Sequence, residues 1–155
     1  MKRLLPHLYA TVSCVSLAIV GVQLAAQTAT PTPPKAYKSL ELSVTGIERA
    51  TSASLKDCPP GANSQRTTAR GAEEFAVVTL KVKVLPGYTP GPLQKPTLTD
   101  TAGKTYNTAV SFVDVGKVPE FSCEIPFRVP LGMTFKTVKV DEALAIDVSA
   151  VEPKR

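Results

Sequence analysis

Apolar residues alternate with polar ones along most of this chain, and that period of two is the property that most restricts its fold. Successive side chains of a β-strand point to opposite faces, so an alternating segment has one face on a core and the other in water. The pattern is clearest between residues 121 and 129, and no segment carries a sustained helical stripe. The spacing predicts about seven strands, over residues 39–49, 74–85, 95–100, 104–113, 119–129, 134–141 and 144–152.

Short strands at this spacing are typical of a sandwich of two sheets. We therefore predict an all-β fold, an immunoglobulin-like two-sheet antiparallel β-sandwich. Most of the 14 prolines and nine glycines fall between the predicted strands. Pro126 is an exception, and a proline inside a strand pattern indicates a sheet edge or a bulge. The chain has no tryptophan and its cysteines lack antibody spacing, so the likeness to antibody domains is one of architecture alone.

The first 26 residues have the three parts of a secretory signal peptide. A basic start is followed by an apolar run and by small residues for cleavage at Ala25 and Ala26. Cys14 lies inside the apolar run, whereas a lipid-modified cysteine would end it, so we interpret Cys14 as part of the signal. Residues 8–26 carry no charge over 19 positions, so an uncleaved membrane anchor is the alternative. Either way the domain is expected outside the cytoplasm, in the periplasm or secreted.

Three segments are predicted: a signal peptide over residues 1–26, a linker over 27–36 and a folded domain over 37–152. The linker is rich in proline and threonine, a composition typical of an extended chain. Cleavage after Ala26 leaves about 129 residues, enough for one domain with its own core. The signal holds two of the 18 basic residues, so the net charge falls from +5 to about +3. The remaining charges are scattered and not interleaved with aromatic residues, so nucleic-acid binding is not expected.

The mature chain is expected to lack enzymatic activity. The one histidine of the full sequence, His7, lies in the predicted signal peptide, and histidine serves most acid–base and metal chemistry near neutral pH. No Ser-x-x-Lys sequence supplies a lysine base for a serine nucleophile. Asp141 and Glu142 are adjacent and point apart, which favours a solvated turn over a carboxylate-based hydrolase. We therefore predict no catalytic, metal-binding or cofactor-binding residues.

Cys58 and Cys123 are the two cysteines of the mature chain. In an oxidising compartment two such cysteines most simply form a disulfide, here across about 65 residues. Two unpaired thiols are the alternative. A redox role is not expected, because the chain has no Cys-x-x-Cys spacing.

The segment LTDTAGKTY, residues 98–106, is predicted to be a hairpin turn between two strands. The side chain of Asp100 can accept a hydrogen bond from the backbone further along, and Gly103 can adopt a positive φ. A calcium ligand at Asp100 is the alternative, although no dense acidic run surrounds it.

Together with the alternating strand EEFAVVTLKVKV and the later segment FSCEIPFRVP, this hairpin carries a family resemblance. The chain resembles bacterial secreted or lipid-anchored immunoglobulin-like domains of unknown function, similar in fold to the mycobacterial secreted immunoprotective antigen. The residues that match the family's hairpin and later strand are Leu98, Asp100, Gly103, Tyr106, Phe127, Val129 and Pro130. The chain departs from the family at residues 85–88, where the usual asparagine is missing. The resemblance covers about residues 70–151 and implies the fold and an extracytoplasmic location, but no catalytic residues.

Two loops are candidate recognition surfaces, with ordinary solvent-facing loops as the alternative. Residues 56–72 are polar and offer Arg66 and Arg70 to anionic groups. Residues 85–96 are expected to expose Tyr88 and Leu93 in a proline-rich frame, which loses little entropy on binding.

The expected function is therefore that of a secreted or periplasmic module that binds a protein or a cell-envelope component, through loops or a sheet edge. A structural accessory domain without a discrete ligand is the second hypothesis. Contact with a membrane is expected only through an uncleaved N-terminal anchor.

Overall fold

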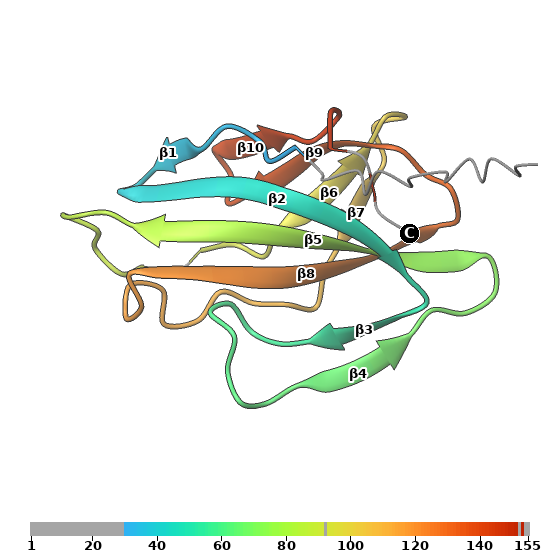
Figure 1. Cartoon of the computed structure of the whole chain (residues 1–155), viewed down its shortest axis with the longest axis horizontal. Coiled ribbons are helices and arrows are strands. Elements are labelled where there is room, and N and C mark those ends of the chain that lie inside the picture. Colours follow the sequence, from blue (N-terminus) through green and yellow to red (C-terminus); the bar gives the residue numbers. More distant parts are fainter. Residues whose placement is uncertain (1–29, 92, 152, 154–155) are drawn as a thin grey trace, which may run out of the picture.

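The computed structural model describes residues 30–91, 93–151 and 153. The predicted signal peptide and the start of the predicted linker lie outside these described residues. The described chain is all-β, and its strands pair antiparallel, as the alternation predicts (Figure 1). This part of the chain holds no helix long and apolar enough to cross a membrane. The strands are β1 (Lys35–Tyr37), β2 (Leu40–Ala50), β3 (Ser52–Leu55), β4 (Gln65–Thr68), β5 (Glu73–Val84), β6 (Thr97–Asp100), β7 (Thr105–Asn107), β8 (Glu120–Pro130), β9 (Phe135–Val140) and β10 (Leu144–Asp147).

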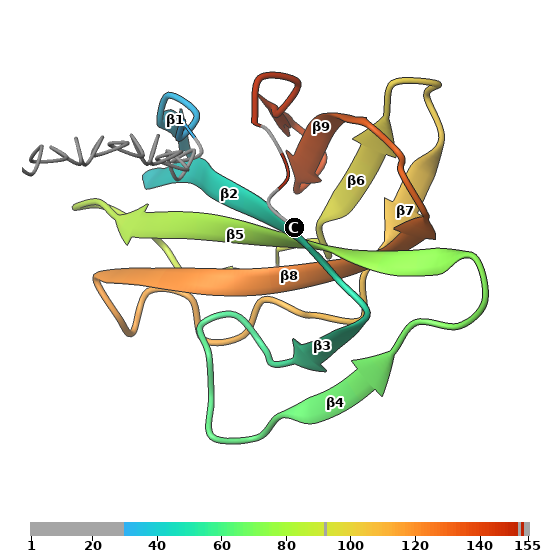
Figure 2. The same cartoon turned by 45° about the vertical axis from the view of Figure 1, so that its right-hand side comes forward.

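The strands form two four-stranded sheets and one small hairpin (Figure 2). The first sheet has the order β1-β2-β5-β8, the second has the order β10-β9-β6-β7, and β3 pairs with β4. Strands β2-β5-β8 correspond to strands A-B-E of an immunoglobulin domain, and β10-β9-β6-β7 correspond to G-F-C-C′. The predicted immunoglobulin-like β-sandwich is confirmed. Strand β1 and the β3–β4 hairpin are additions to that plan.

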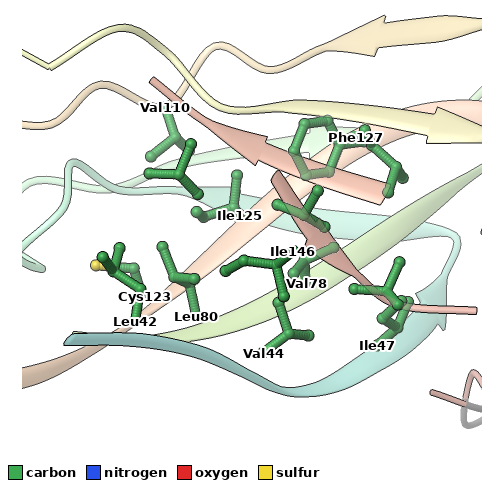
Figure 3. Close-up of a cluster of buried hydrophobic side chains, with 14 of the residues drawn as sticks. Leu42, Val44, Ile47, Val78, Leu80, Val110, Cys123, Ile125, Phe127 and Ile146 are labelled. Atoms are coloured by element: carbon green, nitrogen blue, oxygen red, sulfur yellow. The ribbon is translucent and has the colours of Figure 1, made fainter. Parts of the chain in front are cut away.

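The core lies between the two sheets and is built from the alternating apolar residues (Figure 3). Val44 of β2 pairs with Leu80 of β5, which pairs in turn with Cys123 of β8. The inward residues of β9 and β10, such as Ile146, complete the core from the second sheet. A one-residue slip of any strand would turn its apolar set to water, so burial fixes the strand register.

Pro126 lies in β8, the edge strand of the first sheet, so the prediction of an edge position is confirmed. The pairing of β5 with β8 continues past it without a register shift. The carbonyl of Pro126 accepts a hydrogen bond from the hydroxyl of Thr108 at 2.8 Å, on the side away from β5. The backbone nitrogen of Pro126 also points away from β5. The missing N–H of the proline therefore removes no hydrogen bond between β5 and β8.

The folded unit begins before residue 37, the predicted start. Thr32 is buried, and its N–H donates to the carbonyl of Val44 at 2.8 Å. Its hydroxyl accepts from the N–H of Val44 at 2.9 Å. Strand β1 then follows along the edge of β2. Residues 32–36 of the predicted linker belong to the domain, because they satisfy backbone groups that β2 would otherwise leave unpaired.

Other strand boundaries also differ from the prediction. The strand predicted over residues 104–113 ends at Asn107, because the chain turns there and Thr108 reaches across to the first sheet. The last predicted strand, 144–152, ends at Asp147. The β3–β4 hairpin is absent from the prediction, because each of its strands has only four residues and β4 is entirely polar.

Cys58 and Cys123 form the predicted disulfide, with their Cα atoms 5.6 Å apart. Both cysteines are buried. The backbone N–H of Cys58 donates to Ser111 O at 2.9 Å, and the Cys58 carbonyl accepts from the N–H of Val113 at 2.8 Å. The disulfide joins the segment after β3 to the edge strand β8, and the two hydrogen bonds join it to residues 111–113.

The turn predicted at Asp100 is confirmed. Its Oδ1 accepts from the N–H of Lys104 and its Oδ2 from the hydroxyl of Tyr106, each at 2.9 Å. Gly103 has a φ of 86° in the same turn. Burial raises the pKa of Asp100, but the hydrogen bonds from Lys104, Tyr106 and the backbone outweigh it and lower the pKa. Both carboxylate oxygens of Asp100 therefore accept hydrogen bonds from within the β6–β7 hairpin and stabilise its turn.

Candidate functional site

Several connections between strands meet at one end of the sandwich, which we call the loop end. It consists of residues 38–39, 85–91, 93–96, 112–119 and 141–143. The N–H of Leu85 donates to Ser39 O at 2.9 Å, and the side-chain amide of Gln94 donates to Glu142 at 2.8 Å. In the immunoglobulin topology, the β5–β6 and β9–β10 connections correspond to the B–C and F–G loops, which form the binding surface of antibody variable domains.

Asp141 joins the two sheets at the loop end. Its Oδ2 accepts from the hydroxyl of Tyr37 at 2.8 Å and from the ammonium of Lys38 at 2.9 Å. Its Oδ1 accepts from the N–H of Glu142 at 2.9 Å. The hydrogen bond from Lys38, with those from Tyr37 and the Glu142 backbone, outweighs burial and lowers the pKa of Asp141 to about 2. The prediction of a turn here is correct, but the prediction that Asp141 is solvated is wrong.

Tyr88 packs its ring on Gly116 and so joins two loops of the loop end. A Cβ at Gly116 would lie 3.0 Å from two ring carbons of Tyr88 and 3.5 Å from Pro90. The φ of Gly116 is +105°, which side chains rarely adopt, so glycine is required there for both reasons. Tyr88 and Leu93 are half-buried against the core, and neither is freely exposed as predicted, because their apolar surface covers this end of the sandwich.

The exposed apolar surface of the loop end comes from residues 112–119. Val113 and Val118 are each 40% exposed. Between them, Lys117 forms an ion pair with Asp114 at 3.0 Å, and its N–H donates to the carbonyl of Asp114. Exposed apolar side chains bordered by charges are typical of protein-contact surfaces.

Backbone strain also concentrates at the loop end. Among the described residues, four that are not glycine have a positive φ: Lys38, Ser39, Asp114 and Asp141. All four belong to the loop end. Such a backbone costs about 1–2 kcal/mol at Lys38 and Ser39 and less at the two aspartates, so surrounding contacts must hold these residues in place. Strained residues of this kind cluster at binding and catalytic sites in other proteins.

Arg66 and Arg70, the other predicted site residues, are not part of the loop end. Arg66 is exposed in β4 and donates to the hydroxyl of Ser52 at 3.0 Å. Arg70 is exposed just before β5. Within the described ranges, no hydrogen bond or ion pair joins either arginine to Tyr88 or Leu93, so the two predicted surfaces are separate.

A buried ion pair closes the opposite end of the sandwich. Arg49 of β2 pairs with Glu74 of β5, and their side chains are 9% and 11% exposed. Arg49 also donates to the carbonyl of Met133 and lies over the ring of Phe135. Glu74 accepts from the N–H of Gly132 at 3.0 Å. This pair is absent from the sequence-based prediction, although both residues occupy inward positions of alternating strands, where a charge requires a partner.

No group of three or more His, Cys, Asp or Glu side chains lies close enough together to hold a metal ion within residues 30–91, 93–151 and 153. Comparison with known proteins finds no family model, no curated protein and no solved structure that matches this chain. The resemblance of residues 70–151 to secreted immunoglobulin-like domains therefore stays a prediction.

Proposed function

We propose that this protein is an extracytoplasmic, non-enzymatic binding module that contacts a protein or cell-envelope component through its loop end. The observation that carries the proposal is the concentration of strained, non-glycine residues at that one end. Backbone held in unfavourable conformations by side-chain contacts supports a role for those side chains beyond folding.

The chemistry of the loop end supports contact with a macromolecule. Val113 and Val118 supply apolar area, and Lys117 and Asp114 supply charge at its border. The packing of Tyr88 on Gly116 holds the two loops together before any partner binds. A preformed surface loses less conformational entropy on association than a mobile one.

The extracytoplasmic location rests on two observations. The N-terminal 26 residues have the composition of a signal peptide, and Cys58 is bonded to Cys123. Structural disulfides persist mainly in oxidising compartments. Whether the N-terminal segment is cleaved or retained as an anchor, the domain lies on the same side of the membrane.

Site-specific photocrosslinking in the native host tests the proposal. Benzoylphenylalanine replaces Val118 at the loop end and, as a control, exposed Thr105 of β7 on the outer face of the second sheet. We expect Val118 to give a defined adduct with an extracytoplasmic component and Thr105 to give none. Adding Tyr88→Ala reduces the adduct several-fold, because the 112–119 loop loses its support, while circular dichroism reports that the domain stays folded.

Absence of an adduct at Val118, or the same adducts from Thr105, contradicts binding through the loop end. That outcome favours the second hypothesis, an accessory domain without a discrete ligand. Under that hypothesis, Tyr88→Ala in the full chain leaves the host phenotype unchanged, while a core substitution such as Leu80→Ala abolishes it.

A further inference from the structure

The β3–β4 hairpin is an insertion between strands A and B of the immunoglobulin plan, and it is fixed firmly to the first sheet. The disulfide holds the chain after β3, and Arg128 of β8 reaches the carbonyl of Thr68 in β4. Ala53 of β3 and Phe75 of β5 are buried outside the main core, with the guanidinium of Arg128 over the Phe75 ring. The hairpin is therefore a rigid wall beside the outer face of the first sheet (Figure 2).

A polar groove lies between this wall and the sheet. It consists of two adjoining cavities of about 240 Å³ and about 270 Å³, which share Ser54 and Glu124. The sheet supplies the floor, including Glu48, Val77 and Thr79, and the hairpin supplies hydroxyl groups and Arg66. Together the cavities reach the size range of ligand-binding clefts.

The carboxylates that line the groove outnumber its cations: Glu48, Asp57 and Glu124 stand against Lys56 and Arg66. Two other carboxylates on the outer face have cationic partners: Glu120 pairs with Lys81 at 2.7 Å, and Glu73 pairs with Arg128 at 3.3 Å. For Glu48 and Glu124, the described part of the chain offers no ion pair. Both are exposed at the groove. Arg66 instead donates to Ser52 on the wall.

We propose that this groove binds an extended polypeptide segment that carries a lysine or arginine, with the cationic side chain placed between Glu48 and Glu124. The hydroxyls of Ser54, Thr79 and Ser122 both donate and accept hydrogen bonds, as the backbone N–H and carbonyl groups of such a segment require. This inference stands apart from the loop end, since the two surfaces share no residue.

Titration of the ¹⁵N-labelled full domain by NMR tests the inference. The probe is an acetylated, amidated pentapeptide of sequence SGKGS, its matched control is SGQGS, and spermidine serves as a cation without a peptide backbone. We expect SGKGS to shift the amides of Ser54, Thr79 and Glu124, and SGQGS and spermidine to bind at least several-fold more weakly. Higher salt should weaken the binding of SGKGS.

Four variants make the test specific. Glu48→Gln and Glu124→Gln should each weaken SGKGS about two- to fivefold, the range of a solvent-exposed ion pair. Glu41→Gln, on the same face of β2 but outside the groove, should leave the affinity unchanged. Tyr88→Ala should also leave it unchanged, so the result does not depend on the proposed function of the loop end.

No shift at the groove, or equal binding of SGKGS and SGQGS, overturns the inference. An equal loss of affinity in Glu41→Gln overturns it as well, because the effect would then be one of net charge. Equal binding of spermidine would show a simple cation site and also contradict a polypeptide ligand. Unchanged spectra away from the groove report that each variant is folded.

Discussion

Glu73 and Glu74, neighbours in β5, provide a matched test of how much the buried Arg49–Glu74 ion pair, at the end opposite the loop end, contributes to stability. Glu74 points inward and pairs with Arg49, with side chains 11% and 9% exposed, whereas Glu73 points outward and pairs with Arg128, with side chains 44% and 42% exposed. Glu74→Gln leaves a buried guanidinium without a counter-charge, which costs about 3 kcal/mol or more. Glu73→Gln removes a solvated pair, which contributes less than about 1 kcal/mol.

Urea denaturation at neutral pH measures both free energies of unfolding. For a domain of this size, about 3 kcal/mol corresponds to a fall in Tm of about 12 °C, against less than about 4 °C for Glu73→Gln. Because the two pairs share strand, substitution and chemistry, burial is the main difference between them. Equal losses in the two variants would refute the argument that the Arg49–Glu74 pair closes the sandwich. A double variant, Arg49→Gln with Glu74→Gln, should lose less than the two single losses added together.

Three further predictions concern other parts of the molecule. Gly116→Ala should destabilise the domain by more than about 1 kcal/mol and displace the Tyr88 ring. Gly61→Ala, with open space around the added methyl group, should be near neutral. Thermal melts measure the stability of both variants, and aromatic NMR signals report the position of the Tyr88 ring. Asp141, whose pKa falls from 3.8 to about 2 on folding, should contribute about 2 kcal/mol above pH 5 and lose most of it by pH 2. Urea titrations against pH should therefore show the advantage over Asp141→Asn shrinking as the pH falls, and a constant difference would contradict the linkage. Replacing Cys58 and Cys123 by alanine should lower the free energy of unfolding by about 4 kcal/mol, as expected for a cross-link spanning 65 residues; a loss below about 1 kcal/mol in urea would contradict this.

Sequence alone predicts the sandwich because its core is local information repeated along the chain. Residues such as Val78, Leu80 and Ile125 alternate with polar neighbours, and that alternation decides which face of each strand is buried. The Asp100 turn is equally predictable, since its hydrogen bonds run to Lys104 and Tyr106 within the same hairpin. Both depend on residues close together in the sequence.

The loop end and the groove could not be predicted in this way, because they depend on contacts between distant segments. Asp141 meets Lys38 across 103 residues, and nothing near Asp141 in the sequence indicates a buried carboxylate. Tyr88 belongs to a predicted recognition loop, but its docking on Gly116 requires knowing that two loops share one end. The β3–β4 hairpin has two short strands, one of them entirely polar, so its position beside the first sheet becomes evident only once the disulfide joins it to β8.

The two ends of the sandwich differ in a way that bears on function. A buried ion pair between Arg49 and Glu74 lies at one end. The residues of positive φ in the connections at that end are glycines: Gly71, Gly103 and Gly132. The loop end has glycines of positive φ as well, at Gly87 and Gly116, but it also places Lys38, Ser39, Asp114 and Asp141 in this backbone region. The Asp141 carboxylate offsets part of the cost of this backbone through its bonds to Tyr37 and Lys38. A glycine at Lys38 would relieve the strain but remove the cation that holds Asp141. The β1–β2 turn and the buried carboxylate therefore depend on one another, and this mutual dependence fixes the relative positions of the β1–β2 and β9–β10 turns in the free protein.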